Sequence, residues 1–321
     1  MRRVIIDTDT AGDDTQAMLL SCLSDRVTVE AVTVVAGNVP FDREVENAKY
    51  TLGLAGSLDV PVYEGARQPL VKEFEHATYI HGEGGLGGDL FPDTDVESAA
   101  GFAPDEIVDR CRAAPGEVTL LCIGPLTNLA LAYAREPDLP DLVDEVWVMG
   151  GNVNCEGNVT PAAEFNLWVD PDAASRVFDA FEVTLVDWGL CLRDAVFGPP
   201  EFEAVSGFDT ELASFFESVT EQARAFNSDG PDDPGWTALP DSVTAALLAY
   251  PELREEVSTY HVAVDDREGL TRGYTSVDVN GVTDGDPNTH VVESVDSEAF
   301  QAVIYSLLQS RDPDSGIAAE P

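Results

Sequence analysis

Positive charge and long apolar runs are both scarce in this chain. Its 321 residues include 17 lysines and arginines against 60 aspartates and glutamates, for a formal net charge of −43, and Lys49 and Lys72 are the only lysines. A surface of this charge repels phosphate backbones and anionic membranes, so we expect no nucleic-acid partner and no membrane partner. No apolar run of roughly 18 residues occurs, so we expect no membrane-spanning helix.

Two further absences concern the N-terminus and the cysteines. Met1-Arg2-Arg3 leads directly into an apolar segment and leaves no room for a signal peptide, so we predict a cytoplasmic protein. The five cysteines are odd in number and show no CxxC spacing. We therefore predict reduced, mostly buried thiols, and neither a zinc site nor a disulfide framework.

Hydrophobic residues make up 44% of the chain, which is enough to form a core. The acidic side chains therefore belong on the surface of a folded protein and not in a disordered chain. Excess acid spread along a foldable chain indicates a halophilic protein, because carboxylates retain water and counter-ions in molar salt. The alternative is an ordinary acidic protein.

Short β-branched segments alternate with helical stretches, which predicts right-handed crossovers. We therefore expect one α/β domain over residues 1–310, with an open, mostly parallel, Rossmann-like central sheet flanked by helices, and a flexible tail over 311–321. Glycine-rich residues 76–91 are predicted to form a mobile loop, and residues 227–234 a second loop. Strands are predicted at 4–6, 27–35, 60–63, 118–123, 146–149 and 183–186, and helices at 14–23, 43–54, 104–113, 128–135, 172–181 and 241–250.

The strongest chemical signal is the segment V-I-I-D-T-D-T-A-G-D-D at residues 4–14. Asp7, Asp9, Asp13 and Asp14 follow a buried strand and lead into a helix. Ligands of parallel sheets bind beyond the carboxyl ends of the strands, where this segment lies. Four like charges repel one another unless protons or a cation neutralise them, and hard divalent cations prefer oxygen ligands. The cluster therefore predicts a calcium or magnesium site.

Three familiar motifs also place aspartates at the start of a helix or after a strand. An N-cap at Asp13 needs only one of the four aspartates. An EF-hand loop starting at Asp7 fails, because it needs an oxygen ligand at Ala11 and glutamate at Met18. A haloacid-dehalogenase-type phosphatase, with D-x-D-x-T after a strand, stays open as an alternative. It would need Thr or Val at Ala11 and a lysine further along the chain.

The segment resembles the N-terminal signature D-T-D-P-G-x-D-D of the inosine-uridine-preferring nucleoside hydrolase family, with Thr10 and Ala11 in place of Pro-Gly. The resemblance extends over residues 4–245 in the family's order and implies the nucleoside hydrolase fold and a nucleoside substrate. Its later segments are V-V-A-G-N at 34–38, I-H-G-E-G at 80–84, G-P-L-T-N at 124–128, V-M-G-G at 148–151, E-G-N at 156–158, A-E-F-N at 163–166 and D-P at 170–171.

This resemblance also implies site residues. Calcium would be held by Asp9, Asp14, Asp241 and the backbone carbonyl of Ile123, together with a water and the ribose 2′ and 3′ hydroxyls. A metal-bound water is more acidic than bulk water, so Asp9 could take its proton before attack on C1′. Asp7 would be an outer carboxylate that positions the cluster.

The resemblance further implies the groups that contact the substrate. His81 matches a family histidine near the substrate. Glu164 and Asn166 flank Phe165 and would face one side of an extended segment. Asn38 and Asn158 could instead be simple turn or loop residues. The ribose-binding residues implied by the resemblance are Asp13, Asn38, Asn158, Glu164 and Asn166.

Pro240 departs from the family pattern. Inosine-uridine-preferring members carry a histidine just before the last metal aspartate, placed to protonate the leaving base, and proline has no proton to give. Purine-preferring members stack the base between aromatic rings. Trp188 and Trp236 could do so here, although each indole could also serve only as packing.

Three functions remain open from the sequence. The leading one is calcium-dependent hydrolysis of ribonucleosides to free base and ribose. The others are a non-catalytic, metal-dependent ribosyl-binding protein and a haloacid-dehalogenase-type phosphatase. The retained Asp9 argues against the binding protein, because binding alone needs no general base. By resemblance we also expect a homodimer or homotetramer.

Overall fold

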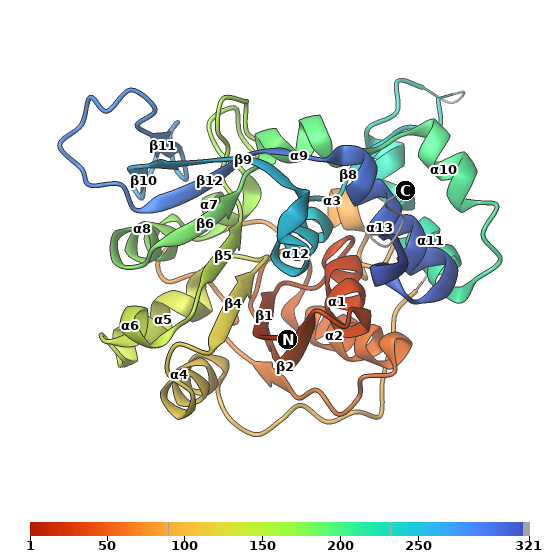
Figure 1. Cartoon of the computed structure of the whole chain (residues 1–321), viewed down its shortest axis with the longest axis horizontal. Coiled ribbons are helices and arrows are strands. Elements are labelled where there is room, and N and C mark those ends of the chain that lie inside the picture. The colour runs from red at the N-terminus through yellow and green to blue at the C-terminus, as the bar shows by residue number, and fades with distance from the viewer. Residues whose placement is uncertain (89, 231–232, 317–321) are drawn as a thin grey trace.

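In the computed structural model, which describes residues 1–88, 90–230 and 233–316, an eight-stranded sheet forms the centre of the molecule (Figure 1). The strands lie in the order β3-β2-β1-β4-β5-β6-β12-β9, and every neighbouring pair is parallel except β12 and β9. The strands are β1 (Arg2–Thr8), β2 (Val27–Val34), β3 (Val62–Glu64), β4 (Val118–Cys122), β5 (Val146–Met149), β6 (Val183–Val186), β9 (Arg254–Tyr260) and β12 (Thr289–Val295).

Helices cover both faces of this sheet, with α1 and α2 on one side and α4, α5 and α8 on the other (Figure 1). The helices are α1 (Asp14–Leu23), α2 (Phe41–Ala55), α3 (Thr78–His81), α4 (Ala103–Ala113), α5 (Thr127–Arg135), α6 (Leu139–Leu142), α7 (Phe165–Val169), α8 (Pro171–Ala180), α9 (Trp188–Asp194), α10 (Pro199–Val205), α11 (Glu211–Phe226), α12 (Pro240–Ala249) and α13 (Ser297–Ser310), with 3₁₀ turns η1 (Pro251–Leu253) and η2 (Pro313–Gly316).

The alternation of side chains along β1 divides the core into two layers. Val4 and Ile6 pack into the cluster under α1, α2 and α12, whereas Ile5 packs into the cluster under α4, α5 and α8. All three are fully buried, as expected for a strand covered on both faces. The predicted α/β fold is therefore confirmed, with the six predicted strands and the six predicted helices present.

The strand order reverses at β1, which pairs with β2 on one side and β4 on the other. Open α/β sheets bind ligands at such a switch point, beyond the carboxyl ends of the strands. The aspartate segment that follows β1 lies at this position.

Two small antiparallel pairs lie outside the sheet. Strands β7 (Val196–Phe197) and β8 (Thr237–Ala238) pair next to α9, and β10 (Val262–Val264) and β11 (Thr275–Val277) form a hairpin against α8. Neither pair was predicted, and nor were β9 and β12, which complete the sheet. Their short or charged segments lack a regular apolar alternation.

Two sequence predictions about loops need correction or limits. Residues 76–91 were predicted to be loop throughout, but residues 78–81 form α3, a single helical turn; residue 89 lies outside the described residues. In the second predicted loop, 227–234, residues 231–232 also lie outside the described residues.

The flexible tail also remains a prediction, because 317–321 lie outside the described residues. In its described part, Asp314 accepts hydrogen bonds from the Tyr250 hydroxyl (2.7 Å), the Ser24 hydroxyl (3.1 Å) and the Asp25 amide (2.7 Å). These bonds join the tail to the ends of α1 and α12.

None of the helices in the described part of the chain is long and apolar enough to cross a membrane. The five cysteines are all free thiols, and Cys111, Cys122 and Cys191 are buried.

Candidate active site

A cavity of about 370 Å³ opens beyond the carboxyl ends of the central strands. Its walls come from the segments that follow β1, β2, β4, β5 and β6, and from α3, α7, α11 and α12. Most of the predicted site residues therefore meet at one place. Those that line the cavity are Asp13, Asn38, His81, Ile123, Asn158, Glu164, Asn166, Trp188, Trp236 and Asp241.

Asp7, Asp9 and Asp14 do not line the cavity. They are buried with exposed fractions of 1%, 0% and 1%. Asp9 accepts a hydrogen bond from the Asn38 amide at its Oδ2 (3.0 Å), while its Oδ1 is buried without a hydrogen-bond partner. Burial, followed by the charges of Asp14 and Glu44, raises the pKa of Asp9 well above its usual range.

Glycines leave room for the Asp9 carboxyl. A Cβ atom on Gly124 would lie 2.7 Å from its Oδ1, and a Cβ atom on Gly37 would clash with its Oδ2. The glycines that follow β2 and β4, Gly37 and Gly124, are therefore required by the close approach of the Asp9 side chain.

Asp7 and Asp14 are each held by a neighbouring hydroxyl. Asp7 Oδ1 accepts from the Thr33 hydroxyl (2.5 Å) and the Asn128 amide (2.7 Å), and its Oδ2 has no partner. Asp14 accepts from the Thr8 hydroxyl (2.6 Å). Burial raises the pKa of each of these two carboxyls to about 7.

Asp13 does not cap the helix that it precedes. Its Oδ2 instead accepts from the backbone amides of Asp241 (2.8 Å) and Ser242 (3.3 Å), so it caps α12 and joins the start of that helix to the start of α1. Burial raises the pKa of Asp13 to about 6. Asp13 therefore stands at the N-cap position of α1, as one interpretation held, but its side chain caps α12 and not α1.

Asp241 brings a distant part of the chain to this cluster. It stands in the first turn of α12, and burial together with the charges of Asp13, Asp14 and Asp9 raises its pKa well above the usual range. Four acidic side chains thus repel one another at the base of the cavity.

The fit of a metal ion can be judged from these donors. In the described residues, no group of three or more His, Cys, Asp or Glu side chains is arranged to hold a metal ion. The donor set is nevertheless entirely oxygen, it carries excess negative charge, and Asp9 Oδ1 is a buried acceptor without a partner. The fourth predicted ligand, the Ile123 carbonyl, accepts from the Asn166 side chain (3.1 Å). These properties suit a hard cation such as calcium.

Besides Asp13, the cavity is lined by the other four predicted ribose-binding residues, Asn38, Asn158, Glu164 and Asn166. The segment from Glu164 to Asn166 is not extended throughout, as predicted: Glu164 has extended backbone as the N-cap of α7, and Phe165 and Asn166 are already helical. Glu164 accepts from the amides of Asn166 (2.8 Å), Gly151 (2.8 Å) and Leu167 (3.2 Å), and these bonds start a helix where we expected extended backbone. Burial raises its pKa to about 7.

The asparagines are all hydrogen-bonded. Asn38 is buried and its side-chain amide reaches Asp14 (3.3 Å), so it is more than a turn residue. The Asn166 side chain donates to the carbonyls of Ile123 and Met149 (3.1 and 3.2 Å). Asn158 is exposed and accepts from the Phe165 amide (2.9 Å).

His81 ends α3 and faces Gly12, where a Cβ atom would lie 2.5 Å from the imidazole Nδ1. Gly12 also has a φ of +47°, so two constraints favour glycine there. Burial lowers the pKa of His81 to about 4, which makes its ring neutral at pH 7.

The mouth of the cavity is apolar. Trp188 begins α9 and Trp236 precedes β8; both are half-buried and pack on the core. Sequence reasoning missed Tyr79 and Phe226, whose rings lie 5.7 Å apart on α3 and α11, and Leu192. Phe226 could have been found from the apolar stripe of α11, which it extends.

Pro240 occupies the first position of α12 and lines the cavity beside Asp241. Proline suits this position, because the first amide of a helix has no intrahelical acceptor. The helix start therefore explains a proline at this position, independently of the chemistry of a leaving base.

An open parallel sheet with a carboxylate-rich cavity beyond its strand ends is the arrangement of an α/β enzyme that acts on a small molecule. Residues 4–302 match the inosine-uridine-preferring nucleoside hydrolase family, and the chain belongs to that family. It is a ribonucleoside N-ribohydrolase, which removes the phosphatase alternative.

Several relatives are similar over nearly their whole length. The pyrimidine-specific ribonucleoside hydrolase RihA of Photobacterium profundum is 34% identical over 96% of this chain and 98% of its own. A plant nucleoside hydrolase structure has a TM-score of 0.89 at 29% identity, covering 96% of this chain and 99% of that one. A purine-preferring ribonucleoside hydrolase from Gardnerella vaginalis has a TM-score of 0.85 at 28% identity, covering 99% and 100%. The specificities in the names of these relatives differ.

Proposed function

We propose that the protein hydrolyses the N-glycosidic bond of ribonucleosides with calcium, and that Asp9 is the general base. The observation that carries this proposal is the buried Asp9 carboxyl, whose Oδ1 has no partner among neighbouring carboxyls that repel it. An acceptor buried in this way costs free energy unless a proton or a cation neutralises it. Asp9, Asp14, Asp241 and the Ile123 carbonyl would hold the ion.

In this proposal Asp9 is both a ligand of the ion and the general base. A bound calcium ion would supply positive charge that makes a nearby water more acidic. Asp9 takes a proton from that water, and the oxygen attacks C1′ as the base leaves through an oxocarbenium-like state. Asp7, anchored by Thr33 and Asn128, keeps the end of β1 in place.

Ribose recognition falls to Asp13, Asn38, Asn158, Glu164 and Asn166 in this proposal. These amides and carboxyls surround one cavity, so a sugar that lacks a hydroxyl would leave some of them unpaired. We therefore expect the protein to hydrolyse ribonucleosides more efficiently than deoxyribonucleosides.

We further propose that purine nucleosides are preferred, with Trp188 or Trp236 stacking on the base. Pro240 cannot donate a proton, and a purine can be protonated on its ring while it stacks. His81 at α3 is the competing proton donor, although burial lowers its pKa to about 4 and so disfavours the protonated ring that this role needs. It would serve either type of base.

Incubation with a panel of nucleosides and p-nitrophenyl phosphate, in molar KCl with calcium, tests the activity. Free base and reducing ribose are expected. Binding of nucleosides without turnover would contradict the proposal. The expected homodimer or homotetramer is checked by light scattering of the same sample.

A further inference from the structure

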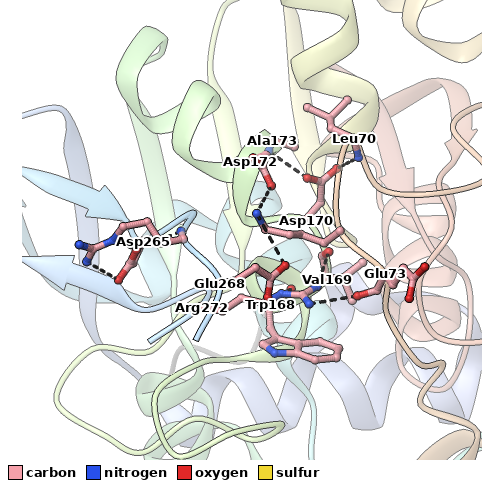
Figure 2. A network of polar contacts seen from close by, with 12 residues as sticks. Leu70, Glu73, Trp168, Val169, Asp170, Asp172, Ala173, Asp265, Glu268 and Arg272 are labelled. Carbon is pink, nitrogen blue, oxygen red and sulfur yellow. Dashed lines mark hydrogen bonds and ion pairs between the residues drawn. The ribbon is translucent and has the colours of Figure 1, made fainter. Parts of the chain in front are cut away.

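Arg272 is a buried arginine outside the cavity, on the connection between β10 and β11, and only 8% of it is exposed. Its guanidinium donates to three backbone carbonyls: Trp168 (2.9 Å), Glu73 (3.0 Å) and Val169 (3.2 Å). The same group lies over the Trp168 ring, 4.3 Å from its centroid. Figure 2 shows this side chain between the end of α7 and the segment that contains Glu73.

The first segment that Arg272 holds is α7, which has five residues. A helix this short gains little from its own hydrogen bonds, and its last carbonyls have no intrahelical donors to bind. Glu164 caps its N-terminus, and Arg272 binds the carbonyls of Trp168 and Val169 at the other end. The helix that carries Asn166 is therefore fixed by a side chain at each end.

The second segment begins at Glu73 and leads to α3 and His81. Along it, the His76 ring is hydrogen-bonded to the Gly37 carbonyl (2.8 Å), and the Ala77 amide donates to the Asn38 carbonyl (2.8 Å). Arg272 thus holds the start of the chain that supports Asn38, and Ala77 of this chain belongs to the same buried cluster as Phe165 and Val169 of α7.

The hairpin touches α7 by backbone as well as by Arg272. A Cβ atom on Gly273 would lie 2.7 Å from Trp168 Cα and 2.9 Å from the Leu167 carbonyl oxygen, and the φ of Gly273 is +76°. On the other side of Arg272, Glu268 lies 3.8 Å from Lys72, which also pairs with Asp172 (3.1 Å). The contact between the hairpin and these two segments is therefore continuous (Figure 2).

Within the described residues Arg272 forms no ion pair. The nearby Asp170 carboxyl is bonded instead to the Thr127 hydroxyl (2.7 Å) and to the amides of Leu70 (2.8 Å) and Ala173 (3.0 Å). A planar guanidinium can donate to three carbonyls at fixed angles, which neither lysine nor glutamine can do.

We propose that Arg272 is a positioning residue for ribose recognition, acting from the β10–β11 hairpin through α7 and through the segment from Glu73 to Ala77. This inference rests on the proposed function of Asn38, Glu164 and Asn166. Arg272 does not touch the substrate cavity; it sets where the groups around it lie.

The test compares Arg272→Gln with Arg267→Gln in the full-length protein. Arg267 is on the same loop, but its side chain is 82% exposed and it pairs with Asp265 beside it. For each variant, kcat/KM is measured with a ribonucleoside and with its 2′-, 3′- and 5′-deoxy analogues. Hydrogen exchange of residues 164–169 and 73–77 is followed as a readout that needs no turnover.

We expect Arg272→Gln to lower kcat/KM for the ribonucleoside by about tenfold. It should lower kcat/KM less for at least one deoxy analogue, so that the preference for the missing hydroxyl falls, and exchange should quicken in both segments. Arg267→Gln should match the wild type. An unchanged hydroxyl preference in Arg272→Gln would overturn the inference, whether kcat/KM stays the same or falls equally for every analogue.

Two further variants keep the inference testable if Arg272→Gln does not fold. Arg272→Lys keeps the charge without the fork and should show the same loss of preference in weaker form. Gly273→Ala leaves Arg272 in place but pushes the hairpin off α7, and should act in the same direction. A wild type that cleaves no ribonucleoside would defeat the proposed function, while the exchange comparison would still decide whether Arg272 holds the two segments.

Discussion

At the base of the cavity, three aspartates from residues 9–14 meet Asp241, and these side chains are held by backbone amides and a threonine hydroxyl. At the mouth, Tyr79, Leu192 and Phe226 come from three different helices and are 48%, 37% and 59% exposed. The base is polar and rigidly bonded; the mouth is apolar and open to solvent. In the proposed function, the chemistry of the reaction belongs to the base of the cavity and the choice of nucleobase to its mouth.

The largest effect is expected at Asp9. Asp9→Asn retains the shape of the side chain but removes the proton acceptor, so kcat should fall by about 10²–10⁴ while KM changes little. Steady-state kinetics with inosine measure both constants. Asp93→Asn, on the surface, is the matched control. An equal loss in binding would mark Asp9 as mainly a metal ligand.

At the mouth, a smaller and selective effect is expected. Trp188→Ala or Trp236→Ala should lower kcat/KM for inosine, adenosine or guanosine by about tenfold more than for uridine or cytidine, because a purine has the larger stacking face. Competition assays with paired nucleosides measure this ratio.

The rival account predicts a different pattern at the mouth. If His81 supplies the proton to every base, His81→Ala should slow inosine and uridine alike, and both tryptophan variants should be nearly silent. A wild type that is faster on uridine than on every purine nucleoside would refute the stacking hypothesis.

A pH dependence is expected from Glu164, which lines the cavity. Its pKa is raised from 4.5 to about 7 in the folded protein, so the folded state binds more protons between these values and stability falls as pH rises through them. The slope for one group is about 1.4 kcal/mol per pH unit. Glu164→Gln should flatten the dependence of Tm on pH, measured in molar KCl between pH 5 and 8; an unchanged slope would contradict the assignment.

The dependence of Tm on KCl should report on the surface carboxyls, whereas the effect of calcium should report on the buried ones. The net charge of −43 should lower Tm as KCl falls from molar to about 0.1 M, where screening reaches only about 10 Å. Calcium at millimolar concentration should act on the buried cluster and recover only part of this loss. A Tm that is independent of KCl would contradict the halophilic interpretation.

The sequence predicted the base of the cavity better than the mouth, for a physical reason. Asp7, Asp9, Asp13 and Asp14 lie within one segment after an apolar strand, so local pattern alone places them together. Asp241 was placed only by resemblance.

The mouth and the hairpin depend on packing between distant elements. Tyr79 and Phe226 are separated along the chain and meet because α3 packs against α11. Arg272 binds carbonyls, and a backbone carbonyl has no signature in the sequence. Asp13 shows the same limit, since its acceptor role toward α12 involves amides far along the chain.

The most direct test of the central claim is calcium removal. The protein is treated with chelator, its metal content is determined by elemental analysis, and ribose release from inosine is measured before and after calcium is added back. The account predicts that turnover disappears in the metal-free protein and returns with calcium. Full activity in a sample that elemental analysis shows to be free of metal would contradict it.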